Sequence, residues 1–133
     1  MNRQRVSSGS PFEKPIGFSR AVRIGAILAV SGTAPITADG RTAHPGNLYE
    51  QTRTCIEIIK DAIETAGARL EDVIRTRIML TDINRWPEAA RAHGEYFGEI
   101  RPASTFVEVS RFIDPEWLVE MEADCVVTQD ENE

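Results

Sequence analysis

The segment VEMEADCV, residues 119–126, alternates apolar and acidic residues. Successive side chains of a β-strand point to opposite faces of the sheet, so Glu120, Glu122 and Asp124 share one face. A buried core would reject three carboxylates, so this face must meet solvent, a cleft or a partner. The pattern therefore predicts a strand over about 117–127, in a sheet with one charged face.

Other strands are indicated by apolar runs and turn residues. Gly25 lies between two such runs, Ser19–Ile24 and Ala26–Ser31, and permits the positive φ of a tight hairpin turn. Further strands are expected at Asn2–Ser7, Val73–Thr81 and 104–112. With two intervening helices, the predicted order of elements is β-β-β-α-β-α-β-β.

The two helices are predicted from caps and apolar stripes. Asn47 suits an N-cap, with Glu50 placed as in a capping box, and Gly67 suits the end of the helix. Asn84 can cap the second helix, whose first turn tolerates Pro87. The expected buried stripes are Cys55, Ile59, Ala62, Ile63 and Ala66 in the first helix and Trp86, Ala89, Ala90, His93 and Phe97 in the second. Both helices would cover one face of a mixed sheet, an α+β arrangement.

The uncovered face of this sheet combines charge with apolar area. In the strand Val73–Thr81, Arg75 and Arg77 are expected to share that face with Val73 and Met79, opposite a set made up of Ile74, Thr76, Ile78 and Leu80. Such a face is too polar for a monomer core and more apolar than a solvated surface needs to be. Burial against another copy of the chain, with the charges paired or lining a wet cleft, resolves the conflict.

Length and charge narrow the classes of function. The 133 residues suit one compact domain, with a strand and loop over 1–15 and an acidic tail over 128–133. A net charge of −6 disfavours a nucleic-acid partner, because such proteins usually present a basic face. Two cysteines without a CxxC motif, no apolar leader and no bilayer-length apolar run favour a soluble, cytoplasmic protein with free buried thiols and no membrane partner.

Three stretches resemble the RidA/YjgF family, whose members are also described as L-PSP endoribonucleases or translation inhibitors. They are IGFSRAVRIGAILAVSGTAP (16–35), EQTRTCIEIIKDAIETAGARLEDVIRTRIMLTDI (50–83) and RPASTFVEVSRFIDPEWLVEMEA (101–123). Together they span about residues 16–127 in the family's order. The resemblance implies a chorismate-mutase-like α+β fold, assembled as a homotrimeric barrel with the helices outside and three small-molecule clefts between subunits.

The resemblance also implies an activity and a site. Active members hydrolyse enamine or imine intermediates to ammonia and a 2-oxo acid, and they use no cofactor. Glu120 matches the glutamate that orients the attacking water, although pairing with a neighbouring subunit's arginine is the structural alternative. Ser31 and Gly32 match a pair whose backbone approaches the ligand, although a turn that ends the strand explains Gly32 equally well. Phe18 matches a pocket tyrosine and would either stack on a planar ligand or simply pack.

The sequence departs from the family at the expected anion site. Active members carry an arginine after Pro-Ala that holds the substrate carboxylate, whereas Ser104 follows Pro102-Ala103 here. This weighs against standard 2-iminoacid deamination. Phe106 replaces a small residue or cysteine and Ala90 replaces an asparagine, so the cavity shape is expected to differ. The candidate replacement cations are Arg101 first, then Arg20, Arg75 and Arg77, each of which also suits a simple salt bridge.

Three hypotheses follow from these residues. The first is a trimeric hydrolase of a C–N bond in a small carboxylate or imine, with Glu120 positioning water. The second is a non-catalytic cleft that binds a 2-oxo acid or another small carboxylate. The third, RNA cleavage or translation inhibition, rests on the family description and is disfavoured by the acidic balance and the missing nucleophile–base set. The sequence shows no metal-ligand spacing.

Overall fold

A computed structural model of the protein describes residues 2–128, so the acidic tail expected at 128–133 lies outside the described residues except for Thr128. One six-stranded sheet has the order β1-β2-β3-β6-β4-β5. Strands β4 and β5 run parallel and all other neighbours antiparallel, so the sheet is mixed, as predicted. The strands are Arg3–Val6 (β1), Ala21–Ile24 (β2), Ile27–Thr33 (β3), Val73–Leu80 (β4), Ala103–Glu108 (β5) and Val119–Val126 (β6).

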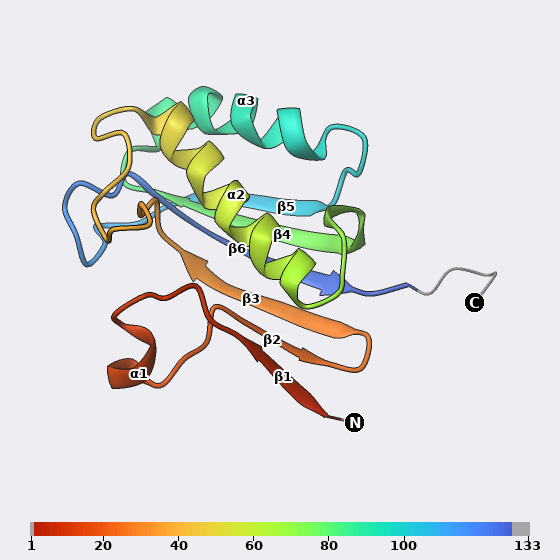
Figure 1. Cartoon of the computed structure of the whole chain (residues 1–133). Coiled ribbons are helices and arrows are strands. Elements are labelled where there is room, and N and C mark those ends of the chain that lie inside the picture. Colours follow the sequence, from red (N-terminus) through yellow and green to blue (C-terminus); the bar gives the residue numbers. More distant parts are fainter. Residues whose placement is uncertain (1, 129–133) are drawn as a thin grey trace.

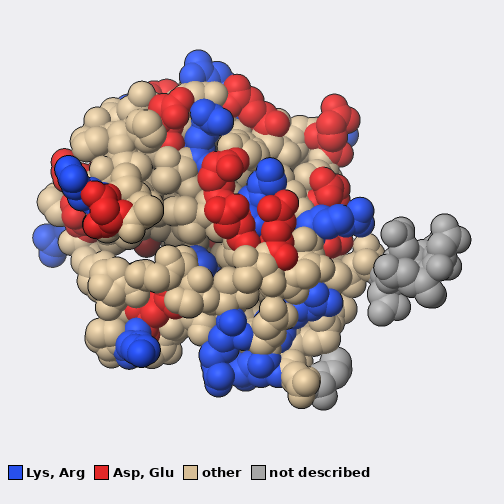
Figure 2. All heavy atoms as spheres, in the orientation of Figure 1, with Lys and Arg blue, Asp and Glu red and all other residues tan. Residues whose placement is uncertain are grey.

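Two long helices lie on one face of the sheet (Figure 1), and this confirms the α+β arrangement. They are α2 (Leu48–Thr65) and α3 (Trp86–Phe97). Three short elements were not predicted, namely the helix α1 (Glu13–Ile16) and the 3-10 helices η1 (Leu70–Asp72) and η2 (Ile83–Arg85). In Figure 2, acidic side chains gather over α2 and basic ones over β1.

The core forms between α2 and the sheet. The stripe predicted for α2 is buried in full, because Cys55, Ile59, Ala62, Ile63 and Ala66 are all at most 4% exposed. These residues belong to one apolar cluster with the buried side chains of β6, which alternate with its acids as predicted. Both cysteines are free and buried. Burial raises the pKa of the Cys125 thiol to about 12, so this thiol stays protonated at neutral pH.

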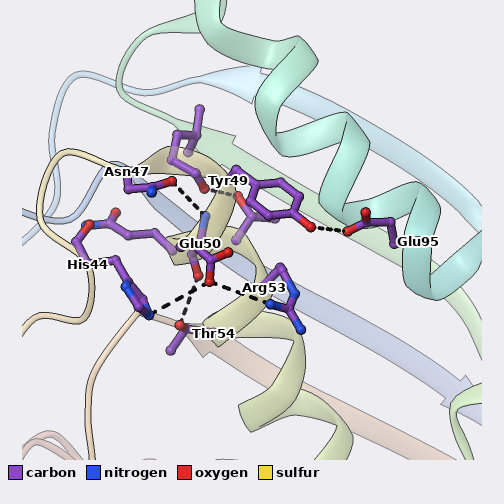
Figure 3. A network of polar contacts seen from close by, with 10 residues as sticks. His44, Asn47, Tyr49, Glu50, Arg53, Thr54 and Glu95 are labelled. Carbon is purple, nitrogen blue, oxygen red and sulfur yellow. Dashed lines mark hydrogen bonds and ion pairs between the residues drawn. The ribbon is translucent and has the colours of Figure 1, made fainter.

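The first turn of α2 shows which part of its predicted cap forms. The Asn47 Oδ1 atom accepts a hydrogen bond of 3.0 Å from the Glu50 N–H, as an N-cap does. In a full capping box the Glu50 side chain would also accept a hydrogen bond from the Asn47 N–H. Here the Asn47 N–H donates to the His44 carbonyl instead. The Glu50 carboxylate turns instead toward His44 Nε2 at 3.9 Å and Arg53 Nη1 at 3.6 Å (Figure 3).

The start of α3 differs from the prediction. Asn84 does not cap this helix; it lies inside η2, where its N–H donates to the Asp82 carboxylate. The 3-10 turn delays the helix until Trp86, whose side chain then points outward and is 53% exposed. The buried residues of α3 are therefore Ala89, Ala92 and Phe97, while Ala90 and His93 are half-buried.

The first two residues of β4 face the opposite way from the prediction, because a β-bulge lies at the start of that strand. Val73 pairs with Cys125 while Arg75 pairs with Asp124, so one extra residue, Ile74, is inserted on β4. As a result Val73 is buried on the helix side and Ile74 is 52% exposed. From Arg75 onward the alternation follows the prediction.

The sheet face away from the helices carries the acids of β6 and the arginines of β4. Arg77 Nη1 lies 2.9 Å from Glu122 Oε1 and 3.5 Å from Asp124 Oδ2. These charges are therefore already paired within one chain. The same face exposes apolar side chains from three strands, namely Ile27, Ile74 and Val107.

Candidate functional site

A cleft of about 700 Å³ opens at one end of the sheet. Its walls are the segment 6–18, the end of β3 with the loop to residue 40, the last turns of α2 and the residues before and within β6. In Figure 2 the surface is hollowed between the part that carries α1 and the part above it. The lining includes apolar side chains, among them Phe18, Ile113 and Trp117, and two opposite charges, Arg20 and Glu120.

A second β-bulge shapes the floor of this cleft. Val30 pairs with Ala123 and Thr33 with Met121, so Ser31 and Gly32 of β3 stand opposite one residue of β6. The Ser31 side chain donates to the Ser19 carbonyl at 2.6 Å, which fixes the bulge. A methyl group on Gly32 would lie 3.9 Å from Glu120 Oε1. The bulge thus places a bare stretch of backbone next to the Glu120 carboxylate.

Glu120 reaches the cleft from β6 and is half-buried. No residue among 2–128 donates a hydrogen bond to its carboxylate. Burial raises the pKa of Glu120, nearby Arg20 opposes the shift, and Glu122 adds to it. A carboxyl group with raised proton affinity and free oxygens can exchange a proton with a bound molecule.

Arg20 is the cation of the cleft and is only 6% exposed. Its Nη1 donates to the Gly32 carbonyl at 2.6 Å and to Thr33 Oγ1 at 3.0 Å, and its Nε donates to Ser8 Oγ at 3.2 Å. The guanidinium carbon lies 5.3 Å from the centre of the Phe18 ring, within cation–π range. Burial lowers the pKa of Arg20, but an arginine remains charged at any physiological pH.

The N-terminal wall is held by a second carboxylate, Glu13, which lies behind it. Its Oε2 accepts hydrogen bonds from Ser8 N, Ser8 Oγ and Ser10 N, each 3.1 Å long. Burial opposes the ionisation of Glu13, but these bonds outweigh it, so its pKa is lowered. Ser8 Oγ therefore links the Glu13 carboxylate to the Arg20 guanidinium.

The structure brings together four of the predicted site residues in this cleft, which are Phe18, Ser31, Gly32 and Glu120. It adds Arg20 to them, one of the candidate replacement cations. Residues that sequence reasoning missed belong mainly to the walls, and they are Ser8, Glu13, Thr33 and Trp117. The run SSGS, residues 7–10, was the one sequence signal for this wall. Serines and glycine favour a loop with free hydroxyl and N–H groups.

The other predicted site residues do not line the cleft of their own chain. Ser104 lies on β5, where its Oγ accepts a hydrogen bond of 2.8 Å from Thr76 Oγ1. Thr76 Oγ1 is also 2.9 Å from His93 Nε2, and the His93 ring meets Phe106 edge to face at 5.8 Å. Burial lowers the pKa of His93, so this imidazole is neutral at pH 7.

Three candidate cations also lie elsewhere. Arg101 is exposed and has a positive φ of 54° in the link before β5. Arg75 is exposed and Arg77 is paired with the acids of β6. A role for Arg101, Ser104 and Phe106 in ligand binding stays a prediction that concerns the assembled protein.

Residues 2–128 contain no helix with the length and apolar character needed to span a membrane. They also contain no group of three or more histidine, cysteine or acidic side chains placed to hold a metal ion.

A mixed sheet with two helices on one face and a cleft carrying a half-buried glutamate defines a recognisable class of α+β protein. The family profile described as endoribonuclease L-PSP matches residues 12–127. A RutC family protein of Pyrococcus abyssi is 41% identical over 111 residues, which cover 83% of this chain and 87% of that protein. The chain therefore belongs to the RidA/YjgF family, as the three motifs indicated.

Solved structures agree with this assignment. Rv2704 of Mycobacterium tuberculosis, a member of the YjgF/YER057c/UK114 family, is 46% identical with a TM-score of 0.86, covering 95% of this chain and 100% of its own. The YjgF gene product of E. coli is 25% identical with a TM-score of 0.79, covering 92% and 98%.

Proposed function

We propose that this protein is a RidA-like homotrimer whose clefts, completed between subunits, bind a small carboxylate or imine and hydrolyse an enamine, imine or related C–N bond. The single observation that carries the proposal is Glu120, a half-buried carboxyl group with a raised pKa and no hydrogen-bond donor among residues 2–128, placed in a cleft beside a cation. The unit that assembles is the one domain predicted for residues 1–133.

Glu120 is the group that moves protons in this mechanism. An enamine first tautomerises to the imine, which reacts as its protonated form, the iminium. Glu120 takes a proton from water as the water oxygen bonds to the iminium carbon, which gives a neutral carbinolamine. Glu120 then returns this proton to the nitrogen, the carbon–nitrogen bond breaks, and the hydroxyl proton passes to the leaving ammonia, so a 2-oxo acid and ammonium remain. The Phe18 ring would lie against the planar substrate.

The bare sheet face supports the trimer. It combines paired charges with exposed Ile27, Ile74 and Val107, a mixture that suits burial against another copy. The separation of Ser104 and Phe106 from the cleft of their own chain also fits clefts that two subunits complete.

The assembly is tested by the mass of the protein in solution. We expect three times 14.8 kDa by light scattering at micromolar concentration. Ile74→Asp should lower the mass, because it would place an unpaired charge in the interface. Trp86→Asp is a matched control, since Trp86 is equally exposed but lies at the start of α3. A monomeric wild-type protein would refute the trimer.

The activity is tested with freshly generated 2-aminoacrylate, by following the release of ammonia and pyruvate. We expect release faster than in buffer, and a loss of roughly 100-fold in Glu120→Gln, as is usual when a general acid–base group is removed. Glu122→Gln is the control, because Glu122 sits on the same strand face but pairs with Arg77. Equal losses in both variants would show that Glu120 has no special role.

A second candidate function is a non-catalytic binder of small carboxylates. The observation that favours it is Ser104, which stands in place of the family arginine and is engaged by Thr76. For this function, thermal stabilisation should grow with the concentration of a 2-oxo acid while ammonia release stays at the rate of buffer. No stabilisation by any 2-oxo acid tested would exclude it.

A further inference from the structure

We infer that Arg20 is the residue that recognises the anionic oxygen of the ligand in this protein. The inference rests on the proposed function, because it assumes that the cleft binds small carboxylates. The anion contact is then made by Arg20, which lines the same cleft as Glu120 in the same chain. It is not made by residue 104 on β5, where active family members carry the arginine.

The hydrogen bonds of Arg20 leave one of its nitrogens free. Nε is used by Ser8, and the two N–H groups of Nη1 are used by Gly32 and Thr33. No residue among 2–128 accepts a hydrogen bond from Nη2. Within the same residues, no fully buried side-chain nitrogen lacks a partner, so Nη2 must reach open space. The open space that borders Arg20 is the cleft.

The same bonds prepare Arg20 to bind an anion. Three contacts already fix the guanidinium, so little conformational entropy remains to be lost when a ligand arrives. Its surroundings are largely shielded from water, which strengthens a charge–charge contact. One free nitrogen can hold one oxygen of a carboxylate, whereas a bidentate fork would hold both. We therefore expect a preference of about tenfold for an anion over a neutral ligand of the same shape.

Glu120 would orient a ligand that is bound to Arg20. The charges of Arg20 and Glu120 influence each other, yet the two side chains form no ion pair within 4.0 Å in the described part of the chain. A small planar molecule with an oxygen toward Arg20 would present its remaining polar end to Glu120. Phe18, which lies against Arg20, would border the plane of that molecule.

The competing explanation is that Arg20 only fastens the N-terminal loop to β3 through Ser8 and Gly32. That role predicts a loss of stability when Arg20 is replaced, but it does not predict that the protein stops distinguishing a charged ligand from a neutral one. The ratio of two affinities in one variant therefore separates the two roles.

The test compares pyruvate with pyruvamide, which have similar shapes and differ in charge. Trp117 lines the cleft, and Trp86→Phe removes the other tryptophan, so binding can be followed by the fluorescence of Trp117. We expect about tenfold tighter binding of pyruvate by the Trp86→Phe protein. Adding Arg20→Gln should bring this ratio close to one.

Arg23→Gln is the matched control. Arg23 also donates to backbone carbonyls, those of Gly25 and Ala66, but it does not line the cleft. The control should keep the tenfold ratio. Arg20→Lys retains a charge and a donor for Gly32 and is expected to fold even where Arg20→Gln does not. It lacks the second guanidinium nitrogen, so its ratio should fall severalfold.

The outcomes distinguish the inference from the proposed function. Binding of pyruvate with a full preference in both Arg20 variants overturns the role of Arg20 and leaves the cleft intact. Binding of neither ligand to the starting protein overturns the proposed function and this inference together. If the preference for pyruvate is lost in the Arg20 variants but kept in Arg23→Gln, the result supports both the role of Arg20 and the proposed function.

Discussion

Two carboxylates near the same cleft behave in opposite ways. Glu13 is 8% exposed and Glu120 is half-buried, yet the pKa of Glu13 is lowered and that of Glu120 is raised. Burial favours the neutral form of both groups. The difference lies in the donors, because three hydrogen bonds from Ser8 and Ser10 reach Glu13 and none from residues 2–128 reaches Glu120.

The backbone around each group explains this difference. Glu13 follows the loop 7–12, whose N–H groups are not committed to a sheet and are free to turn toward a carboxylate. Glu120 lies in β6, between β3 and β4, where the backbone N–H groups serve neighbouring strands. A loop carboxylate therefore becomes a fixed structural anion, while a strand carboxylate at the cleft keeps its oxygens for a ligand or a proton.

The largest expected effect comes from removing the anion that organises the loop. Glu13→Gln should lower the free energy of unfolding by roughly 2 kcal/mol at pH 7, because charge-assisted hydrogen bonds are replaced by weaker ones. Since the folded pKa of Glu13 is lowered, its stabilisation is present above the ordinary glutamate pKa of 4.5 and is lost as the pH falls through the folded pKa. Urea unfolding at several pH values measures both effects.

For Glu13, the difference between wild type and variant should therefore shrink under acidic conditions. A constant difference from pH 7 to pH 3 would mean that the carboxylate charge does not contribute. Glu122→Gln controls for the loss of one negative charge elsewhere on the molecule.

Sequence patterns predicted the elements whose causes are local. The alternation of β6 and the stripe of α2 follow from periodicity, so both were found, and the family motifs placed Phe18, Gly32 and Glu120 at one site. The bulge that exposes Ile74 was missed because it depends on the register with β6, which one strand alone does not reveal.

The wall of the cleft was missed for a similar reason. The bonds from Ser8 to Glu13 and from Arg20 to Ser8 join residues of a loop that has no periodicity to read. Arg20 lies twelve positions before Gly32, and only the β2–β3 hairpin and its bulge bring the two together. Such contacts follow from the tertiary structure.

A smaller effect, on turnover, is expected when a substitution supplies Glu120 with a hydrogen-bond donor like those that reach Glu13. Gly32→Ser would place a hydroxyl within reach of Glu120 Oε1, because a Cβ there already lies 3.9 Å away. A hydrogen bond to the ionised form should lower the pKa of Glu120 and reduce turnover by about tenfold. The acidic limb of the pH–rate profile should move to lower pH.

Gly32→Ala is the matched control for this change, since it adds the same carbon without a donor. It should leave the pH–rate profile in place. If alanine and serine shift the profile equally, the shape of the cleft and not the hydrogen bond controls Glu120.

The smallest effect is the change in the free energy of unfolding caused by Glu120→Gln. Its sign is expected to be opposite to that of Glu13→Gln. Because the folded pKa of Glu120 is raised, its ionisation costs stability as the pH rises above the ordinary glutamate pKa of 4.5. Glu120→Gln avoids this cost, so the variant should be slightly more stable than wild type at pH 7, and the advantage should disappear below about pH 4.5. Parallel urea titrations of the Glu13 and Glu120 variants test the contrast directly, since their differences from wild type should have opposite signs at pH 7 and both should shrink in acid. A Glu120 variant that is less stable than wild type at pH 7 would mean that this carboxylate has a stabilising partner in the assembled protein.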